Sequence, residues 1–295
     1  MKIAVTGAAG YIGRYVIAEL TRHPVETVAV ARNMSKIPDE WSCDIRQMDI
    51  SEAEEGVLAS IGSPDVVIHL AWGGLPNYNS MHHIETELPS QYRFLSLLVK
   101  EGLKTLIVAG TCLEYGMQYG PLKEELEARP STSYGYAKNA LRIQLEYLQQ
   151  QHPFNFTWGR LFYLYGEGQS SNSIYSQLRE AVHRGKEYFN MSGGEQLRDY
   201  LPIEKAAAYI VDLAKEEANV GILNIASGQP VSMRTMVERW IYENKWKIKL
   251  NLGHFQYPKY EPMAFWSDGM KLSKFERGDQ NGNDIPCRSV AGFSK

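Results

Sequence analysis

The sequence predicts an α/β protein, a doubly wound parallel sheet with a smaller C-terminal substrate lobe. Three observations carry this prediction. The chain opens with a strand, a glycine-rich turn and a helix. Short apolar runs then alternate with stretches that carry apolar residues at helical spacing, which is typical of parallel strands joined by helices. After Gly168 the alternation gives way to short helices and to loops rich in Gly, Ser and Asn.

The opening turn predicts a dinucleotide site. A short apolar strand runs into Thr6-Gly7-Ala8-Ala9-Gly10-Tyr11-Ile12-Gly13, and a helical pattern follows. Gly7 permits the tight turn, Gly10 lets the backbone approach a pyrophosphate, and Gly13 lets the helix pack close to the sheet. The helix N-terminus offers unpaired N–H groups and a positive dipole end to phosphates. A turn with a purely structural role is the alternative interpretation.

The end of the second strand bears on the choice of coenzyme. NAD sites usually place Asp or Glu there, while a cation accommodates the extra phosphate of NADP. The strand at 26–31 ends just before Arg32, and its one acid, Glu26, lies at the wrong end. A guanidinium suits a phosphate dianion, so we expect NADP(H), with NAD(H) as the alternative. A solvated surface arginine is the competing interpretation of Arg32.

Further elements follow in order. The third strand lies within 42–50 and ends at Asp49-Ile50, which we expect over the adenine. The apolar run 64–71 predicts a buried strand, with His69 as a satisfied core histidine, and the following pair His82-His83 is interpreted as surface. Other predicted strands lie at 105–110, 154–162 and 220–226, and predicted helices at 92–99, after Tyr134 and at 232–244.

Composition excludes several functions. The 295 residues are 44% hydrophobic, enough for one large domain or two closely joined lobes. The net charge of −3 and the dispersed basic residues argue against nucleic acid or a membrane surface as partner. The chain has no apolar run of membrane length, and Met1 leads directly into a strand. The three cysteines are too scattered for disulfides or a metal cluster. We therefore expect a cytoplasmic protein without a metal.

The change of pattern also predicts domain boundaries. Residues 1–165 are expected to form a dinucleotide-binding Rossmann domain, and residues 166–295 mainly a substrate-binding lobe. Elements near 201–228 are expected to return to the first domain. The last eighteen residues, from Gly278, are polar and weakly periodic, so we expect them to be loosely held.

Two residues four apart carry the candidate chemistry. Tyr134 and Lys138 share a helix face, and a nearby ammonium favours the anionic form of a phenol, which lowers its pKa from about 10. Such a tyrosine exchanges protons near neutral pH. Thr111, at a neighbouring strand end, can supply a hydroxyl to the same substrate oxygen. Tyr136 is a decoy, because its fourth neighbour is Ala140 rather than a lysine.

Together these motifs resemble the extended short-chain dehydrogenases/reductases of the NDP-sugar epimerase/dehydratase group over most of the chain. The matching segments are the glycine turn, Asp49, His69-Leu70-Ala71, Thr111 with Tyr115-Gly116, Tyr134-x-x-x-Lys138, Arg160 with Tyr165-Gly166, Arg198-Asp199-Tyr200 and Asn224 to Gly228. The resemblance implies a general acid/base role for Tyr134. It makes Lys138 the anchor of the nicotinamide ribose and Thr111 the hydroxyl partner.

The resemblance also implies the binding residues. Arg198 would contact the substrate diphosphate and Asp49 the adenine. The expected cofactor-binding set is Gly7, Gly10, Tyr11, Ile12, Gly13, Arg32, Asp49, Ile50, Leu70 and Ala71, with Tyr134 and Lys138. The candidate substrate-lining residues are Trp72, Thr111, Tyr163, Arg198, Tyr260 and Trp266. Related proteins commonly dimerise through the helix after Tyr134 and the helix before the fifth strand, so a homodimer is expected.

Departures from the family pattern narrow the reaction. The 4,6-dehydratases carry Asp-Glu directly after the threonine, whereas this chain has Cys112-Leu113, which cannot do that acid chemistry. Many members have an Asn where this chain has Tyr163. The helix before the fifth strand also lacks the usual Asn, with Glu87 and Arg93 in that region.

Three functions remain open. The pattern is most similar to reductases that use NADPH on an NDP-4-keto-6-deoxyhexose, of the dTDP-6-deoxytalose- or dTDP-fucose-forming type, in surface-polysaccharide sugar biosynthesis. An NDP-sugar 4-epimerase that retains NAD is the alternative, but such enzymes typically carry an acid after the second strand. A non-catalytic NADP sensor or scaffold with the same fold is a third, although such relatives usually lose the tyrosine or the lysine.

Overall fold

The computed structural model describes residues 1–257 and 261–277. At its centre is a seven-stranded parallel sheet in the order β11-β7-β5-β4-β1-β2-β3, which confirms the predicted doubly wound fold. The strands are β1 (Lys2–Thr6), β2 (Glu26–Ala31), β3 (Asp44–Gln47), β4 (Val66–His69), β5 (Thr105–Thr111), β7 (Asn155–Leu161) and β11 (Gly221–Ile225). The strand order reverses direction between β1 and β4, and such a switch point is where open α/β sheets bind ligands.

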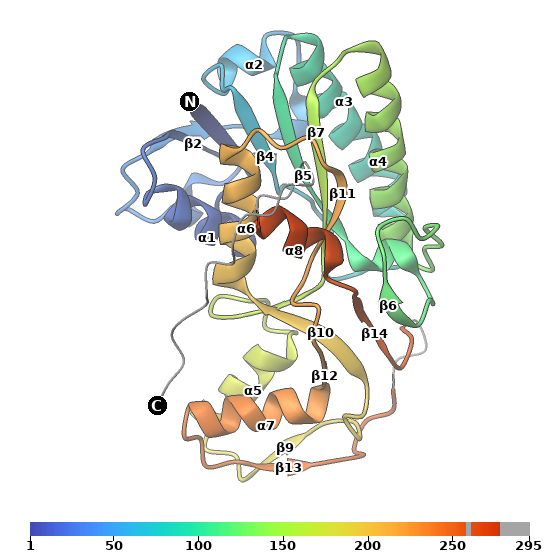
Figure 1. Cartoon of the computed structure of the whole chain (residues 1–295). Helices are drawn as coiled ribbons and strands as arrows, with labels where there is room; N and C mark the ends of the chain where they lie inside the picture. Colours follow the sequence, from blue (N-terminus) through green and yellow to red (C-terminus); the bar gives the residue numbers. More distant parts are fainter. Residues whose placement is uncertain (258–260, 278–295) are drawn as a thin grey trace.

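Helices cover both faces of this sheet (Figure 1). On one face lie α1 (Tyr11–Leu20), α6 (Ile203–Lys215) and α8 (Met270–Glu276); on the other lie α2 (Val57–Ser60), α3 (Leu88–Lys100) and α4 (Ser133–Gln151). Each face has its own apolar core. Because β1, β4 and β5 are covered on both sides, their sequences read as continuous apolar runs rather than alternating patterns.

A smaller lobe lies beyond the carboxyl ends of the strands, at the bottom of Figure 1. β7 leads into β8 (Tyr163–Tyr165) and β11 into β12 (Pro230–Ser232), and both join β10 (Leu197–Pro202) in a three-stranded sheet. The lobe also contains α5 (Ile174–His183), α7 (Met233–Glu243) and the pair β9 (Tyr188–Asn190) and β13 (Lys249–Asn251). A third small pair, β6 (Gly120–Leu122) and β14 (Phe265–Ser267), lies beside the lobe.

Asp199 of β10 fixes this lobe to the main sheet. One of its oxygens accepts from the backbone N–H of Ser227, at 2.7 Å, and from its hydroxyl. The other accepts from the N–H groups of Gly228, at 2.9 Å, and Ser267, at 3.2 Å. The turn after β11 and the end of β14 are therefore tied to the same buried carboxylate.

Some residues singled out in the sequence lie outside the described part of the chain. These are Tyr260, Cys287 and the polar tail from Gly278. Within residues 1–257 and 261–277, no helix combines the length and apolar character needed to cross a membrane. The same residues contain no group of three or more His, Cys, Asp or Glu side chains placed to hold a metal ion.

Gly13 offers a direct test of the packing at the opening turn. A methyl group there would lie 2.6 Å from the Ala8 carbonyl oxygen and closer still to that of Gly7, and neither backbone atom can rotate away. We expect Gly13→Ala to destabilise the protein by about 3 kcal/mol, despite the higher helix propensity of alanine. Urea unfolding measures this. The control is Ala18→Gly on the exposed face of α1, with an expected cost of about 1 kcal/mol. Equal costs for the two variants would contradict the packing argument.

Candidate functional site

The glycine turn forms a cradle that a dinucleotide fits. Gly7 has a φ of +70°, and a methyl group on it would lie 2.8 Å from the amide nitrogen of Ala71, just beyond β4. The turn after β1 therefore packs directly against the residues after β4, Leu70 and Ala71. The α1 helix starts at Gly10 without a side-chain cap, which leaves its first N–H groups available to an anion. The residues present thus suit a pyrophosphate at this helix N-terminus.

Two neighbours of the turn have different surroundings. Tyr11 contacts Tyr15 edge to face, and its buried hydroxyl has no hydrogen-bond partner within the described residues. Burial raises the pKa of this phenol far above its usual value. Ile12 instead packs against the apolar core beneath α1. Tyr11 is therefore the polar side chain at this turn that is left with unused hydrogen-bonding capacity.

The coenzyme-determining end of β2 carries a cation and a nearby acid. Arg32 is largely exposed, and its guanidinium lies 3.7 Å from the carboxylate of Asp49. Asp49 caps the 3₁₀ turn Ile50–Glu52, since it accepts from the backbone N–H of Ser51 at 3.0 Å. These hydrogen bonds and Arg32 lower the pKa of Asp49. Arg32, Asp49 and Ile50 are thus brought together at one end of the sheet.

The candidate catalytic residues also meet. Tyr134 and Lys138 lie in the first two turns of α4, which Thr132 caps by accepting from the N–H of Gly135 at 3.1 Å. Thr111 ends β5, and its hydroxyl is hydrogen-bonded to the phenol of Tyr134. Lys138 is buried and donates from Nζ to the carbonyl oxygen of Ala109 at 2.9 Å. The three side chains form one group at the carboxyl end of β5.

The sequence predicted that Lys138 lowers the pKa of Tyr134, and this prediction was wrong. Burial raises the pKa of Tyr134 far above its usual value, and only the hydrogen bond from Thr111 opposes this. The Lys138 ammonium lies 6.0 Å from the centroid of the Tyr134 ring and is itself buried, which lowers its own pKa to about 7. Desolvation, and not attraction to the other group, thus dominates the pKa of each. Tyr134 is held as a neutral phenol, a proton donor.

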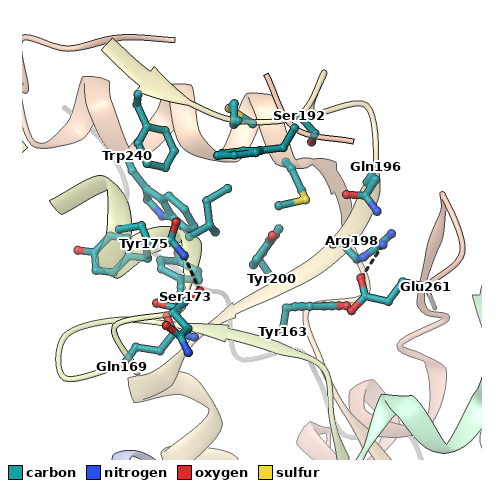
Figure 2. Close-up of a pocket in the computed structure, with 18 of the residues that line it drawn as sticks. Tyr163, Gln169, Ser173, Tyr175, Ser192, Gln196, Arg198, Tyr200, Trp240 and Glu261 are labelled. Carbon is teal, nitrogen blue, oxygen red and sulfur yellow. Dashed lines mark hydrogen bonds and ion pairs between the residues drawn. The ribbon is translucent and has the colours of Figure 1, made fainter. Parts of the chain in front are cut away.

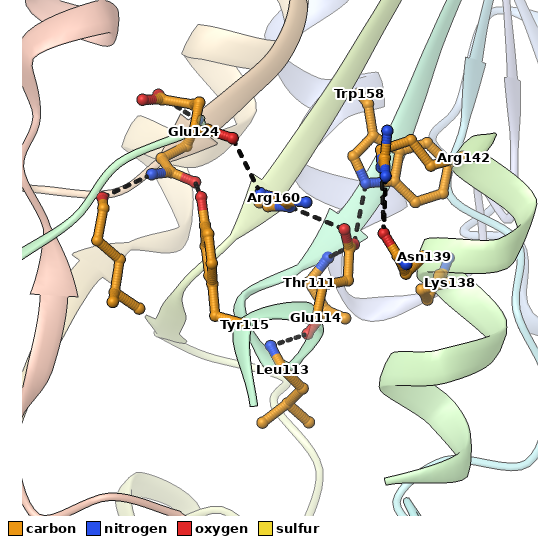
Figure 3. A network of polar contacts seen from close by, with 12 residues as sticks. Thr111, Leu113, Glu114, Tyr115, Glu124, Lys138, Asn139, Arg142, Trp158 and Arg160 are labelled. Carbon is orange, nitrogen blue, oxygen red and sulfur yellow. Dashed lines mark hydrogen bonds and ion pairs between the residues drawn. The ribbon is translucent and has the colours of Figure 1, made fainter. Parts of the chain in front are cut away.

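A fully buried carboxylate holds the end of β5 beside this site (Figure 3). Glu114 lies in the 3₁₀ helix η4 (Cys112–Tyr115) directly after β5. One oxygen accepts from the N–H of Thr111 and from the indole of Trp158, both at 2.9 Å, and the other accepts from Arg160 at 2.8 Å. Both oxygens of the acid nearest to Thr111 are therefore engaged. Glu114 was assigned no role from the sequence, and the signal that could have found it is an acid between the apolar residues Leu113 and Tyr115.

The histidines take different roles. His69 is buried between the hydroxyl of Thr6, at 2.8 Å, and the amide oxygen of Gln91, at 2.7 Å, and burial lowers its pKa to about 3. This confirms His69 as a satisfied core histidine. The interpretation of His82-His83 as surface holds for the partly exposed His82 and is wrong for His83. His83 is fully buried, with its ring centroid 5.2 Å from that of Tyr134, because the loop after β4 folds over it.

A cavity of about 400 Å³ opens within the smaller lobe, and Tyr78 from the loop after β4 also lines it (Figure 2). Tyr163 and Arg198 line it, as expected. Trp72, Thr111 and Trp266 are absent from the described lining. Trp72 instead packs edge-on against Tyr134, with ring centroids 5.8 Å apart. The ring centroid of Tyr78 lies 5.7 Å from that of Tyr134, so Tyr78 connects the cavity lining to the candidate catalytic group, none of whose three side chains lines the cavity.

Some buried polar atoms of the cavity lining make no hydrogen bond. Within the described residues, four buried atoms of its lining lack hydrogen-bond partners: Tyr163 OH, Gln169 Oε1, Gln196 Nε2 and Trp240 Nε1. Arg198 is almost fully buried and pairs with Glu261 at 2.9 Å. Its guanidinium also lies 4.6 Å from the ring centroid of Phe265. A ligand with donors, acceptors and a negative charge suits this lining.

The fold and the cradle at the glycine turn are those of a class of dinucleotide-binding proteins. A model of the NAD dependent epimerase/dehydratase family matches residues 3–226, and the chain belongs to this family. It is therefore an enzyme of a family of NAD-dependent nucleotide-sugar oxidoreductases and epimerases, and its cofactor is a nicotinamide dinucleotide.

Particular relatives point in the same direction. The chain is 32% identical over 272 residues to dTDP-6-deoxy-L-talose 4-dehydrogenase (NAD(+)) of Aggregatibacter actinomycetemcomitans, across 90% of this chain and 99% of the relative. It is 23% identical over 255 residues to dTDP-4-dehydro-6-deoxyglucose reductase of Escherichia coli, across 80% and 79%. The solved UDP-N-acetylglucosamine 4-epimerase of Methanobrevibacter ruminantium M1 superposes with a TM-score of 0.80 at 20% identity, covering 92% and 91%, which shows the shared fold.

Proposed function

We propose that this chain is an NADPH-dependent reductase of the C4 ketone of a nucleoside-diphosphate 4-keto-6-deoxyhexose. Its product would be of the dTDP-6-deoxy-L-talose or dTDP-fucose type, for surface-polysaccharide sugar biosynthesis. Two relatives support this substrate class, because their names specify a dTDP-6-deoxyhexose and the E. coli relative is a reductase. At 32% identity, the first relative also covers nearly the whole chain.

The observation that carries the proposal is the chemistry available beside Thr111. Tyr134 supplies a phenol that keeps its proton, and Thr111 supplies a hydroxyl. The two positions where dehydratases carry acids hold Cys112 and Leu113, and the next acid, Glu114, is buried with both oxygens engaged. The group can therefore protonate a sugar oxygen, but it offers no carboxyl group to expel the C6 hydroxyl.

The roles of the residues follow from this arrangement. The nicotinamide dinucleotide supplies hydride chemistry when bound. Tyr134 donates a proton to the C4 oxygen, and Thr111 hydrogen-bonds the same oxygen as its negative charge develops. Lys138 adds a positive charge one helical turn away. Arg198 binds the diphosphate in the cavity, where the neutral lining residues orient the rest of the substrate.

The coenzyme preference rests on Arg32. The residue after β2 is a cation, and the nearest carboxylate, Asp49, is engaged by Ser51. The name of the Aggregatibacter relative specifies NAD(+), so the preference for NADPH proposed here depends on Arg32 alone. An extra phosphate would replace Asp49 as the partner of an exposed guanidinium, which costs little desolvation.

A homodimer through α3 and α4 is part of the proposal. The exposed side chains of Tyr136, Ile143 and Tyr147 lie along α4 at spacings of seven and four residues, which places them on one face. The other face of α4 packs on the sheet through Leu141, Leu145 and Leu148. An exposed aromatic and aliphatic stripe of this kind suits a second copy of the same helix.

Replacement of the phenol tests the reaction. We expect Tyr134→Phe to lower kcat by about 10²- to 10⁴-fold, because the proton donor is lost, while the Kd for the coenzyme stays the same. NADPH consumption with dTDP-4-keto-6-deoxyglucose or its 3,5-epimer, with NMR of the product, gives the measurement. Tyr136→Phe is the control, since that phenol is exposed. Normal turnover by Tyr134→Phe would refute the assignment, and C4 epimerisation without NADPH consumption would indicate an epimerase.

Replacement of Arg32 tests the coenzyme. We expect Arg32→Ala to raise the KM for NADPH about ten-fold and to leave the KM for NADH unchanged, because only NADPH carries the extra phosphate. The matched control is Arg46→Ala, which removes a half-exposed arginine from neighbouring β3. Steady-state kinetics with each coenzyme give the result. Equal use of both coenzymes by the unmodified protein would remove the argument from Arg32.

A charge on α4 tests the dimer. We expect Tyr147→Glu to convert a dimer into a monomer, because two like charges would meet across the stripe. Size-exclusion chromatography with light scattering measures the mass. Tyr242→Glu, on exposed α7, is the control and should leave the mass unchanged. A monomeric unmodified protein, or a dimer that survives the substitution, would contradict this interface.

A further inference from the structure

We propose that His83 is a positioning residue for Lys138: it fixes the indole of Trp72, and the face of that indole holds the lysine ammonium. The inference rests on the proposed function only for the use made of Lys138 in the reaction. The arrangement itself lies wholly within the protein and can be measured without substrate.

The first step is the contact between Trp72 and Lys138. Nζ of Lys138 lies 4.0 Å from the centroid of the Trp72 ring, well inside the range of a cation–π interaction. An ammonium has three donors, and within the described residues its one hydrogen-bond acceptor is the carbonyl oxygen of Ala109. Lys138 is almost fully buried, so the indole face replaces part of the hydration that this cation has lost.

The second step is what holds the indole. Nε1 of Trp72 donates to Nδ1 of His83 at 3.1 Å, and the two rings are stacked at 30° with centroids 6.3 Å apart. Nε2 of His83 lies 2.9 Å from the carbonyl oxygen of Asn77. A carbonyl only accepts and an indole N–H only donates, so Nε2 of His83 donates to Asn77 and Nδ1 accepts from Trp72. This single tautomer joins the loop after β4 to the indole.

The position of His83 makes the arrangement rigid. His83 begins the π-helical turn His83–Glu87 that leads into α3, and π-helical turns are frequent at functional sites. Its side chain is fully buried, and its ring centroid lies 5.2 Å from that of Tyr134. Lys138 is thus enclosed by the side chains of His83, Trp72 and Tyr134. A shift of the His83 ring would therefore move the Trp72 indole that contacts the lysine ammonium.

The third step is the balance of charge around Lys138. Glu114 in η4 and Glu87 at the end of the π-helical turn favour the ammonium, while burial lowers its pKa to about 7. The remaining titratable neighbours are neutral, since burial keeps the proton on Tyr134 in α4 and off His69 at the end of β4. With its pKa near neutrality, Lys138 is sensitive to the loss of any one contact that favours its charge, and the Trp72 ring, at 4.0 Å, is one such contact beside the carbonyl of Ala109.

The test is a direct titration of Lys138 in the full-length protein. NMR of ¹³C-labelled lysine side chains separates it from lysines that titrate near 10, and Lys138→Met identifies its signal. His83→Phe keeps the ring but cannot accept the indole N–H. We expect it to lower the pKa of Lys138 by about one, with about a five-fold lower kcat at pH 7 and an unchanged KM for the sugar nucleotide. His83→Asn keeps an acceptor near the position of Nδ1 and should restore both values.

Trp72→Leu provides a second variant, because it removes the aromatic face and leaves His83 in place. We expect it to lower the pKa of Lys138 at least as much as His83→Phe does. An unchanged pKa in Trp72→Leu would overturn the inference. A changed pKa in Trp72→Leu but not in His83→Phe would overturn the role of His83. A protein that shows both shifts but reduces no keto sugar would uphold the inference and refute the proposed function.

Discussion

The buried carboxylate of Glu114 is the constraint on which the catalytic edge of the sheet depends. It joins the end of β5 to two side chains of β7, Trp158 and Arg160. A fully buried ion pair is tolerated only when its polar atoms are satisfied, and Glu114 meets this condition with three donors. The N–H of Thr111 is one of these donors, so the same carboxylate fixes the hydroxyl that meets Tyr134.

This constraint explains why the site has the chemistry of a proton donor rather than of an elimination catalyst. Since Glu114 points into the protein and Cys112 is buried beside it, the substrate meets hydroxyl groups at the end of β5. Burial raises the pKa of the Cys112 thiol as it does that of Tyr134. The groups at this edge therefore keep their protons at neutral pH, which suits the reduction of a ketone.

The sequence predicted those parts of the site that depend on neighbours along the chain. The glycine turn, the Tyr134–Lys138 spacing and the strand ends at Thr111 and Arg32 are local patterns, and the structure places them at the same edge. The parts that were missed or wrong depend on burial. His83 was assigned to the surface, because no neighbouring residue in the sequence indicates that the loop after β4 covers it. The pKa of Tyr134 was expected to fall, because the spacing of Tyr134 and Lys138 shows their proximity but not the desolvation that raises this pKa.

The cavity of the smaller lobe contains a second buried ion pair, and the sequence spacing of its two residues does not predict it. Arg198 is buried, and Glu261, more than sixty residues later in the chain, neutralises it at 2.9 Å. Two charges in a protein interior are costly unless they are paired. A nucleotide diphosphate that binds Arg198 offers it a second anion, so Glu261 must either turn away or share the guanidinium. If Arg198 binds the diphosphate as proposed, affinity for the substrate depends on how much more favourable that ion pair is than the existing pair of Arg198 with Glu261.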